Sequence, residues 1–183
     1  MTHLRTPGDS SLIAYGREKL GFVPNFLHPF SLAPEIYEGW EKLLAAVRAD
    51  MAPLRYELVT LAAARALGSR YCVLAHASVV LRDGLLDDAT LVASMTDPDT
   101  SGLPPAEVAV MAFAGALATD PYTASPDALE VLRGHGLSEN DIFHVITAVA
   151  ARQFFTTVLA ATGTGPDDRY DALAPELRAA LLT

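Results

Sequence analysis

Apolar residues recur at helical spacing along nearly the whole chain, and this periodicity limits the possible folds more than any other feature. The alternation of apolar and polar residues that marks a half-buried strand is scarce, and alanine and leucine dominate. The sequence therefore predicts an all-α protein. The expected helices span residues 9–20, 34–49, 54–67, 70–82, 86–94, 105–119, 126–134, 139–161 and 174–182.

Proline and glycine mark the longer connections between these helices. Residues 20–35 contain three prolines, and their phenylalanines, Phe22, Phe26 and Phe30, are expected to pack onto the helices. The 183 residues suit one domain. We therefore expect a single domain over residues 1–183, in which residues 1–33 form a partly extended N-terminal lead-in.

Composition excludes several classes of protein. The formal net charge of −9 argues against a nucleic-acid surface, because phosphate contacts need clustered lysine and arginine. A single cysteine excludes an internal disulfide and favours a reducing compartment. The N-terminus lacks the pattern of a signal peptide, and no uninterrupted apolar run reaches the ~18 residues of a transmembrane helix. We expect a cytoplasmic protein that binds neither nucleic acid nor a membrane.

The single cysteine, Cys72, lies in the run GSRYCVLAH. Gly68 is a typical left-handed helix end, and Ser69 is a typical N-cap for the next helix. Cys72 then occupies the third position of that helix, where free backbone N–H groups and the helix dipole favour a thiolate. His76 follows one turn later on the same face, so its side chain can meet that of Cys72.

Glu57 lies on the preceding helix, within an apolar run where a carboxylate needs a partner. The imidazole of His76 is a candidate, and such a base can take the proton of a thiol. The alternatives are structural: Cys72 as a small core residue, His76 as a core histidine, and Glu57 paired with Arg55 or Arg65. Ser69 can also act as a helix cap alone.

The remaining polar residues give weaker signals. Arg65 and Arg70 flank the motif and are expected to be solvated surface charges, with contact to an anionic substrate as the alternative. His135 and His144 show no metal-ligand spacing with His76. A phosphate-binding glycine loop is also absent from the sequence. We therefore expect neither a metal nor a cofactor.

The stretch ELVTLAAARALGSRYCVLAH, residues 57–76, resembles the signature of the alkylhydroperoxidase AhpD-like, carboxymuconolactone decarboxylase-like superfamily. That signature is a glutamate, a first cysteine twelve residues later, and then C-x-x-C-x-x-x-H. Glu57 matches the glutamate, Cys72 the second cysteine and His76 the histidine. Ser69 stands where the family has its first cysteine.

The resemblance extends over residues 15–168. Residues 21–44 resemble the lead-in of the peroxidase-related branch, and residues 132–163 resemble its closing long helix. It implies an AhpD-like helical domain, in which an antiparallel helix hairpin carries the motif, and a homo-oligomer. Long alanine-rich helices with flat apolar faces also favour association between copies.

The resemblance further implies thiol-based peroxidase chemistry. In the family the second cysteine is activated through the histidine and the glutamate, which here are Cys72, His76 and Glu57, with Ser69 and Tyr71 in support. A serine cannot form the family's redox disulfide. The sequence thus favours a peroxidase-related oxidoreductase that acts on a peroxide or another small substrate and is reduced by an external thiol or reductase partner.

Two other functions fit the same residues. The first is a non-redox, carboxymuconolactone decarboxylase-like lyase, in which His76 and Glu57 transfer protons and Cys72 lines the pocket. The second is a catalytically decayed helical protein that serves as an interaction module.

Overall fold

The computed structural model describes residues 2–182, which form helices joined by loops, with no strand among them. The prediction of an all-α protein is confirmed. The elements are α1 (Ser11–Tyr15), the π-helix η1 (Gly16–Leu20), α2 (Leu27–Phe30), α3 (Pro34–Arg48), α4 (Pro53–Ala66), α5 (Arg70–Arg82), α6 (Asp88–Thr96), η2 (Pro98–Thr100), α7 (Pro105–Thr119), η3 (Pro121–Thr123), α8 (Pro126–Gly134), α9 (Glu139–Ala161), η4 (Asp168–Ala172) and α10 (Pro175–Leu182).

All nine expected helices are present, with ends within two residues of the predicted ones. The first is divided, because its second half continues as the π-helix η1. The lead-in contains one helix that the sequence does not predict, the four-residue α2, which includes Pro29. Helical periodicity cannot reveal a helix of about one turn, since a face needs two turns to repeat.

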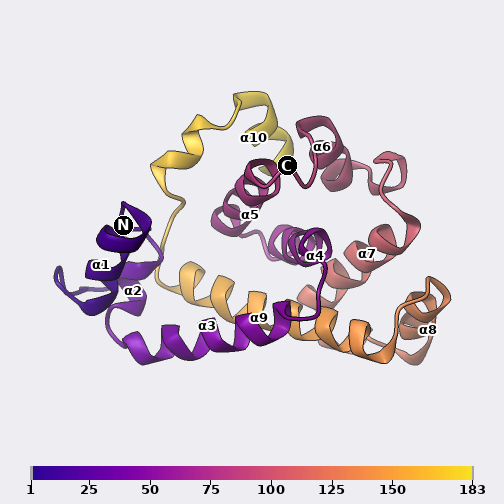
Figure 1. Ribbon diagram of the computed structural model, residues 1–183, viewed down its shortest axis with the longest axis horizontal. Helices are drawn as coiled ribbons and strands as arrows, with labels where there is room; N and C mark the ends of the chain where they lie inside the picture. The colour runs from indigo at the N-terminus through magenta and orange to yellow at the C-terminus, as the bar shows by residue number, and fades with distance from the viewer. Residues whose placement is uncertain (1, 183) are drawn as a thin grey trace.

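Helix α4 forms the centre of the molecule, with α5, α7 and α9 packed around it (Figure 1). Its buried residues lie on all sides, which is typical of a helix enclosed by others. Leu58 and Leu61 belong to a core cluster shared with α5 and α10, whereas Val59 and Ala63 belong to a second cluster shared with α7 and α9. The helix therefore separates two halves of the core.

Helices α4 and α5 form the expected antiparallel hairpin. Gly68 has a left-handed φ of 66°, and Ser69 caps α5 through its side chain. The turn is thus built as the sequence predicts, with a residue that tolerates positive φ followed by a hydroxyl that accepts a helical N–H. This turn sets the start of α5 and thereby places Cys72 in the first turn of that helix.

Helix α9 is long and apolar enough, by length and composition, to cross a membrane. Half of its most apolar stretch is nevertheless buried within the domain, where it packs against α3, α4 and α7. Ser138 and Asp141 begin it with a capping box. These contacts are those of a core helix in a helical domain.

The segment after α9 returns to the N-terminal lead-in. The backbone N–H of Asn25 donates to Asp167 Oδ1 at 2.6 Å, and the Asn25 side-chain amide donates to the carbonyls of Gly165 and Pro166. The expected packing of phenylalanines is present for Phe26 and Phe30, whose ring centroids lie 5.4 and 5.5 Å from that of Phe155 of α9. The ring of Phe22 instead lies against the guanidinium of Arg169 in η4. The lead-in and the segment after α9 together form one side of the pocket that contains Cys72, through Phe26 and Tyr170.

Candidate active site

Cys72 lies at the first turn of α5, with a side chain that is almost fully buried. The hydroxyl of Ser69 accepts a hydrogen bond from the backbone N–H of Cys72 at 3.4 Å. The thiol therefore stands at the N-terminal end of the helix, where the dipole is positive. Ser69 acts on Cys72 through the backbone, as an N-cap.

The sulfur opens toward a cavity of about 530 Å³ whose lining comes from the lead-in, α3, α4, α5, α9 and η4. Its walls are rich in aromatic rings, and Trp40 stacks on Phe155 with centroids 4.4 Å apart. Apart from Glu57 and Arg152, the charged residues of the lining are Glu41, Arg48, Arg82 and Asp83. The volume suits a small organic molecule.

Glu57 and His76 form the pair that the sequence predicts. His76 Nδ1 lies 2.6 Å from Glu57 Oε2, and the carboxylate is buried. The alternative partners are excluded within the described residues, because Arg55 binds Glu107 of α7 at 2.6 Å and Arg65 makes no bond to Glu57. The buried carboxylate on α4 thus serves to hold the imidazole on α5.

Arg152 of α9 is the central residue of the site and is not among the residues that the sequence predicts there. This buried guanidinium bridges Cys72 and His76: Nη1 donates to Cys72 Sγ at 3.4 Å, and Nη2 lies 2.7 Å from His76 Nε2. Among the hydrogen bonds of residues 2–182, none joins Cys72 to His76 directly. The expected direct contact of thiol and imidazole is therefore replaced by a contact through Arg152.

This bridge determines the protonation of the imidazole. A guanidinium only donates hydrogen bonds, so His76 Nε2 accepts and the ring proton is on Nδ1, where it is donated to Glu57. Burial, and then the positive charge of Arg152, lower the pKa of His76 below its usual 6.5, and Glu57 opposes them. The net result is a neutral imidazole whose Nε2 lone pair faces Arg152.

A second contact to the sulfur also comes from α9. Thr156, one turn after Arg152, places its Oγ1 3.6 Å from Cys72 Sγ. The guanidinium, the hydroxyl and the positive end of α5 all face the sulfur, and each of them favours negative charge there. A readable signal for Arg152 exists in the sequence, since it is the one charge in the apolar run from Val145 to Phe155.

Tyr71, expected to support the site, lines the pocket and anchors the C-terminal segment. Its hydroxyl donates to Asp167 Oδ2, and its ring meets that of Tyr170 edge-on at 6.0 Å. Burial, and then the hydrogen bond to Asp167, raise the pKa of Tyr71 far above its usual value. Tyr71 thus remains protonated and has a structural role.

The remaining histidines stand apart from the site. His144 Nδ1 lies 2.7 Å from the carbonyl oxygen of Val47, and His135 is exposed. Within residues 2–182, no group of three or more histidine, cysteine, aspartate or glutamate side chains is arranged to hold a metal ion.

Comparison with known proteins agrees with this architecture. Residues 34–116 match the carboxymuconolactone decarboxylase family. A search of curated protein sequences returned no match. Among solved structures, a peroxidase-related protein with an alkylhydroperoxidase AhpD core, from Ralstonia eutropha JMP134, is 20% identical with a TM-score of 0.78 over 92% of this chain and 94% of that one.

Two further structures share the fold. A peroxidase-related protein from Silicibacter sp. TM1040 is 20% identical with a TM-score of 0.71, over 93% of this chain and 94% of that one. A cysteine-to-alanine variant of the debrominase Bmp8, in complex with 2,3,4-tribromopyrrole, is 19% identical with a TM-score of 0.77, over 96% of each chain.

The all-helical fold of this protein is thus the fold of the AhpD-like structures. The family match over residues 34–116 includes residues 57–76, whose resemblance predicts the same superfamily.

Proposed function

We propose that this protein is a thiol-dependent, peroxidase-like oxidoreductase in which Cys72 is the single reactive cysteine and an external thiol is the reductant. The observation that carries the proposal is the Arg152 bridge, with one guanidinium nitrogen on the sulfur and the other on His76. A cationic donor beside a thiol at a helix N-terminus stabilises the thiolate, which is the nucleophilic form. The peroxidase-related names of the structural neighbours support the same chemistry.

The reaction balances with a hydroperoxide and two thiols. The Cys72 thiolate attacks the outer oxygen of the hydroperoxide, so an S–O bond forms, the O–O bond breaks, and Cys72 becomes a sulfenic acid. The departing alkoxide takes a proton from water and leaves as the alcohol, while Arg152 stabilises the charge that develops on it. One external thiol then displaces water to form a mixed disulfide, and a second thiol restores the Cys72 thiol.

In this scheme His76 and Glu57 are positioning residues. Glu57 holds the ring proton on Nδ1, which leaves the Nε2 lone pair free to accept from Arg152. The guanidinium is thereby kept in one orientation, with its other terminal nitrogen on the sulfur. A buried arginine needs such partners, because an unpaired charge is costly to bury.

A lyase is the second candidate, and one observation favours it. The His76 imidazole is neutral, so its Nε2 becomes a proton acceptor whenever Arg152 releases it. The family match to carboxymuconolactone decarboxylases supports the same alternative. In that reaction Cys72 would only line the pocket.

The test compares the purified wild type with Cys72→Ala and His76→Ala. We expect the wild type to consume cumene hydroperoxide in the presence of dithiothreitol, and dimedone to trap a sulfenic acid on Cys72 that mass spectrometry detects. Cys72→Ala should lose both properties. A decarboxylase activity on carboxymuconolactone that survives Cys72→Ala and is lost in His76→Ala would establish the lyase instead.

Two further results would reject the proposal. Since one protein of this fold is a debrominase, 2,3,4-tribromopyrrole belongs in the panel, and turnover of it alone would contradict a peroxidase. Inertness toward every substrate, together with recovery of a bound protein partner, would show an interaction module.

A further inference from the structure

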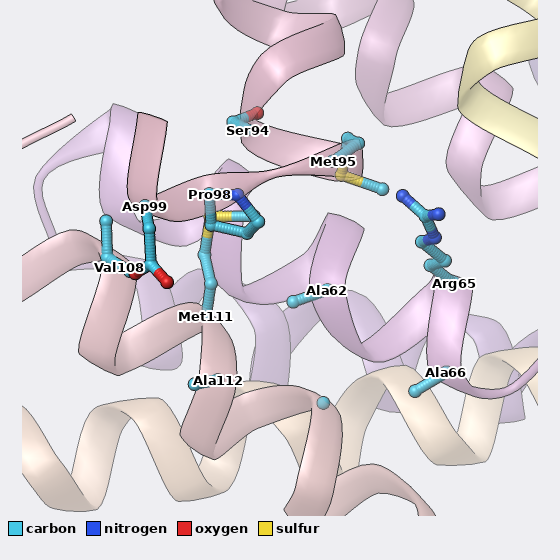
Figure 2. A pocket seen from close by; sticks show the side chains of 11 residues that line it. Ala62, Arg65, Ala66, Ser94, Met95, Pro98, Asp99, Val108, Met111 and Ala112 are labelled. Carbon is cyan, nitrogen blue, oxygen red and sulfur yellow. The ribbon is translucent and has the colours of Figure 1, made fainter. Parts of the chain in front are cut away.

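A second cavity, of about 550 Å³, lies between α4, α6, η2 and α7 (Figure 2). None of its lining residues also lines the Cys72 pocket, so the two cavities are separate. Its walls are mostly apolar, and small side chains such as Ala62 on α4 and Ala112 on α7 leave the space open. The volume is within the range of ~300–1,000 Å³ that is typical of small-molecule sites.

Arg65 is the one cation among the residues that line this cavity. Its Nη1 atom is buried and has no hydrogen-bond partner. The expectation of a solvated surface charge holds only in part for Arg65, which is partly exposed on α4 but has a buried Nη1 atom. A buried cationic donor without an acceptor is unfavourable, and an anion placed beside it would remove that cost.

The cavity is polar at its two ends and apolar between them. In Figure 2, Arg65 lies at one end, Asp99 and Val108 lie at the other, and Met95 and Met111 lie between. The carboxylate of Asp99 repels an anion from its own end, so an anionic head group is directed to Arg65. Methionine side chains adapt readily to an aliphatic chain.

We propose that this cavity binds a medium-chain monocarboxylate, with its head group on Arg65 and its aliphatic chain against Met95 and Met111. This site is independent of the function proposed for Cys72. The ligand satisfies the unpartnered Nη1 atom and fills the apolar space at the same time. Neither a neutral chain nor a small inorganic anion does both.

Calorimetric titration of the full chain with octanoate and with 1-octanol tests the proposal. We expect octanoate to bind more tightly than 1-octanol in the wild type. Arg65→Gln should weaken octanoate binding by ~10–100-fold, the range for a hydrogen bond to a charged group, and leave 1-octanol binding unchanged. Arg70→Gln is the matched control, because it removes an exposed positive charge five residues away, outside this cavity, and should bind as the wild type does.

Two more variants keep the proposal falsifiable. Met111→Trp fills the cavity and should abolish binding of both probes, whereas Cys72→Ala alters only the other pocket and should bind octanoate normally. Circular dichroism is the check that each variant is folded. Equal affinity for octanoate and 1-octanol, equal binding by Arg65→Gln and the wild type, loss of octanoate binding in Cys72→Ala, or no binding at all would overturn the proposal.

Discussion

Arg152 Nη2 lies 2.7 Å from His76 Nε2, and this hydrogen bond is one of the contacts that join helix α9 to helix α5. With the bonds to Glu57 and Cys72, it completes a chain of contacts across α4, α5 and α9. Each side chain in this chain fixes the next, because the guanidinium can only donate and the carboxylate can only accept. The reactivity of the sulfur should therefore depend on residues that do not touch it.

Replacement of Arg152 tests this dependence most directly. We expect Arg152→Gln to slow alkylation of Cys72 by iodoacetamide at neutral pH by ~10–100-fold, because a charge-assisted hydrogen bond to the sulfur is lost. Arg82→Gln is the control, since Arg82 lines the same pocket but pairs with Asp83 at its surface. An unchanged rate in a folded Arg152→Gln protein would show that the guanidinium does not activate the thiol.

The lowered pKa of His76 gives stability a defined pH dependence. As the pH falls through 6.5, the ordinary value, the unfolded chain takes up a proton at His76 and the folded protein does not. The free energy of unfolding therefore decreases toward acid pH, until the pKa of His76 in the folded protein is reached. We expect the melting temperature to fall more steeply between about pH 7 and about pH 5 in the wild type than in His76→Gln, which cannot titrate.

Glutamine is the informative replacement for His76, because its amide can donate to Glu57 and accept from Arg152. His135→Gln serves as the control: it removes an exposed histidine and should keep the pH profile of the wild type. The same profile in His76→Gln and in the wild type would contradict a neutral imidazole in the folded protein.

Ser69→Cys should create a redox pair with Cys72. The two positions are three residues apart across the first turn of α5, a separation that a disulfide can span. Loss of the serine cap should cost ~0.5–2 kcal/mol. After mild peroxide treatment, intact-mass analysis should show the loss of two hydrogens in Ser69→Cys and not in the wild type. A folded variant that never forms this bond would show that the turn is built differently.

Tyr71→Phe should destabilise the protein, because it leaves the buried Asp167 with one donor fewer. We expect the free energy of unfolding in urea to fall by ~1–3 kcal/mol. Tyr122→Phe is the matched control, since Tyr122 is 93% exposed. A Tyr71→Phe variant as stable as the control would show that the C-terminal segment is held by its other contacts.

We further expect the protein to form homo-oligomers. Two adjacent helices expose large apolar side chains, Ile36 and Leu43 on α3 and Phe143 and Phe154 on α9. Light scattering at micromolar concentration should give a mass that is a multiple of 19.5 kDa. Leu43→Glu should lower this mass, and a replacement of Tyr122 by glutamate should not. A wild-type monomer would refute the expectation.

Local sequence patterns are sufficient to predict most of the helices of the fold. The helix over residues 139–161 is predictable to its ends, because Ser138 caps it and Gly163 follows it with a left-handed φ of 66°. The hairpin turn is equally readable from Gly68 and Ser69. Helix α2 is not, since its one turn is set by packing of Phe30 against Phe155 rather than by any local repeat.

The site is readable only in part, for a related reason. Cys72, His76 and Glu57 are linked by spacing within one hairpin, so the sequence alone brings them together. Arg152 lies 80 residues from Cys72, and only the packing of α9 on the hairpin brings the two together. Asp167 is similarly distant from Tyr71 and lies in a segment without helical periodicity.

The burial of Cys72 restricts which reductants can complete the proposed cycle. The side chain is 1% exposed, at the base of a pocket with aromatic walls. A pocket of about 530 Å³ has room for a low-molecular-weight thiol, and the burial of Cys72 disfavours contact with a cysteine of a folded protein. If the proposed cycle operates, we therefore expect a small thiol to be a better reductant of Cys72 than a folded protein.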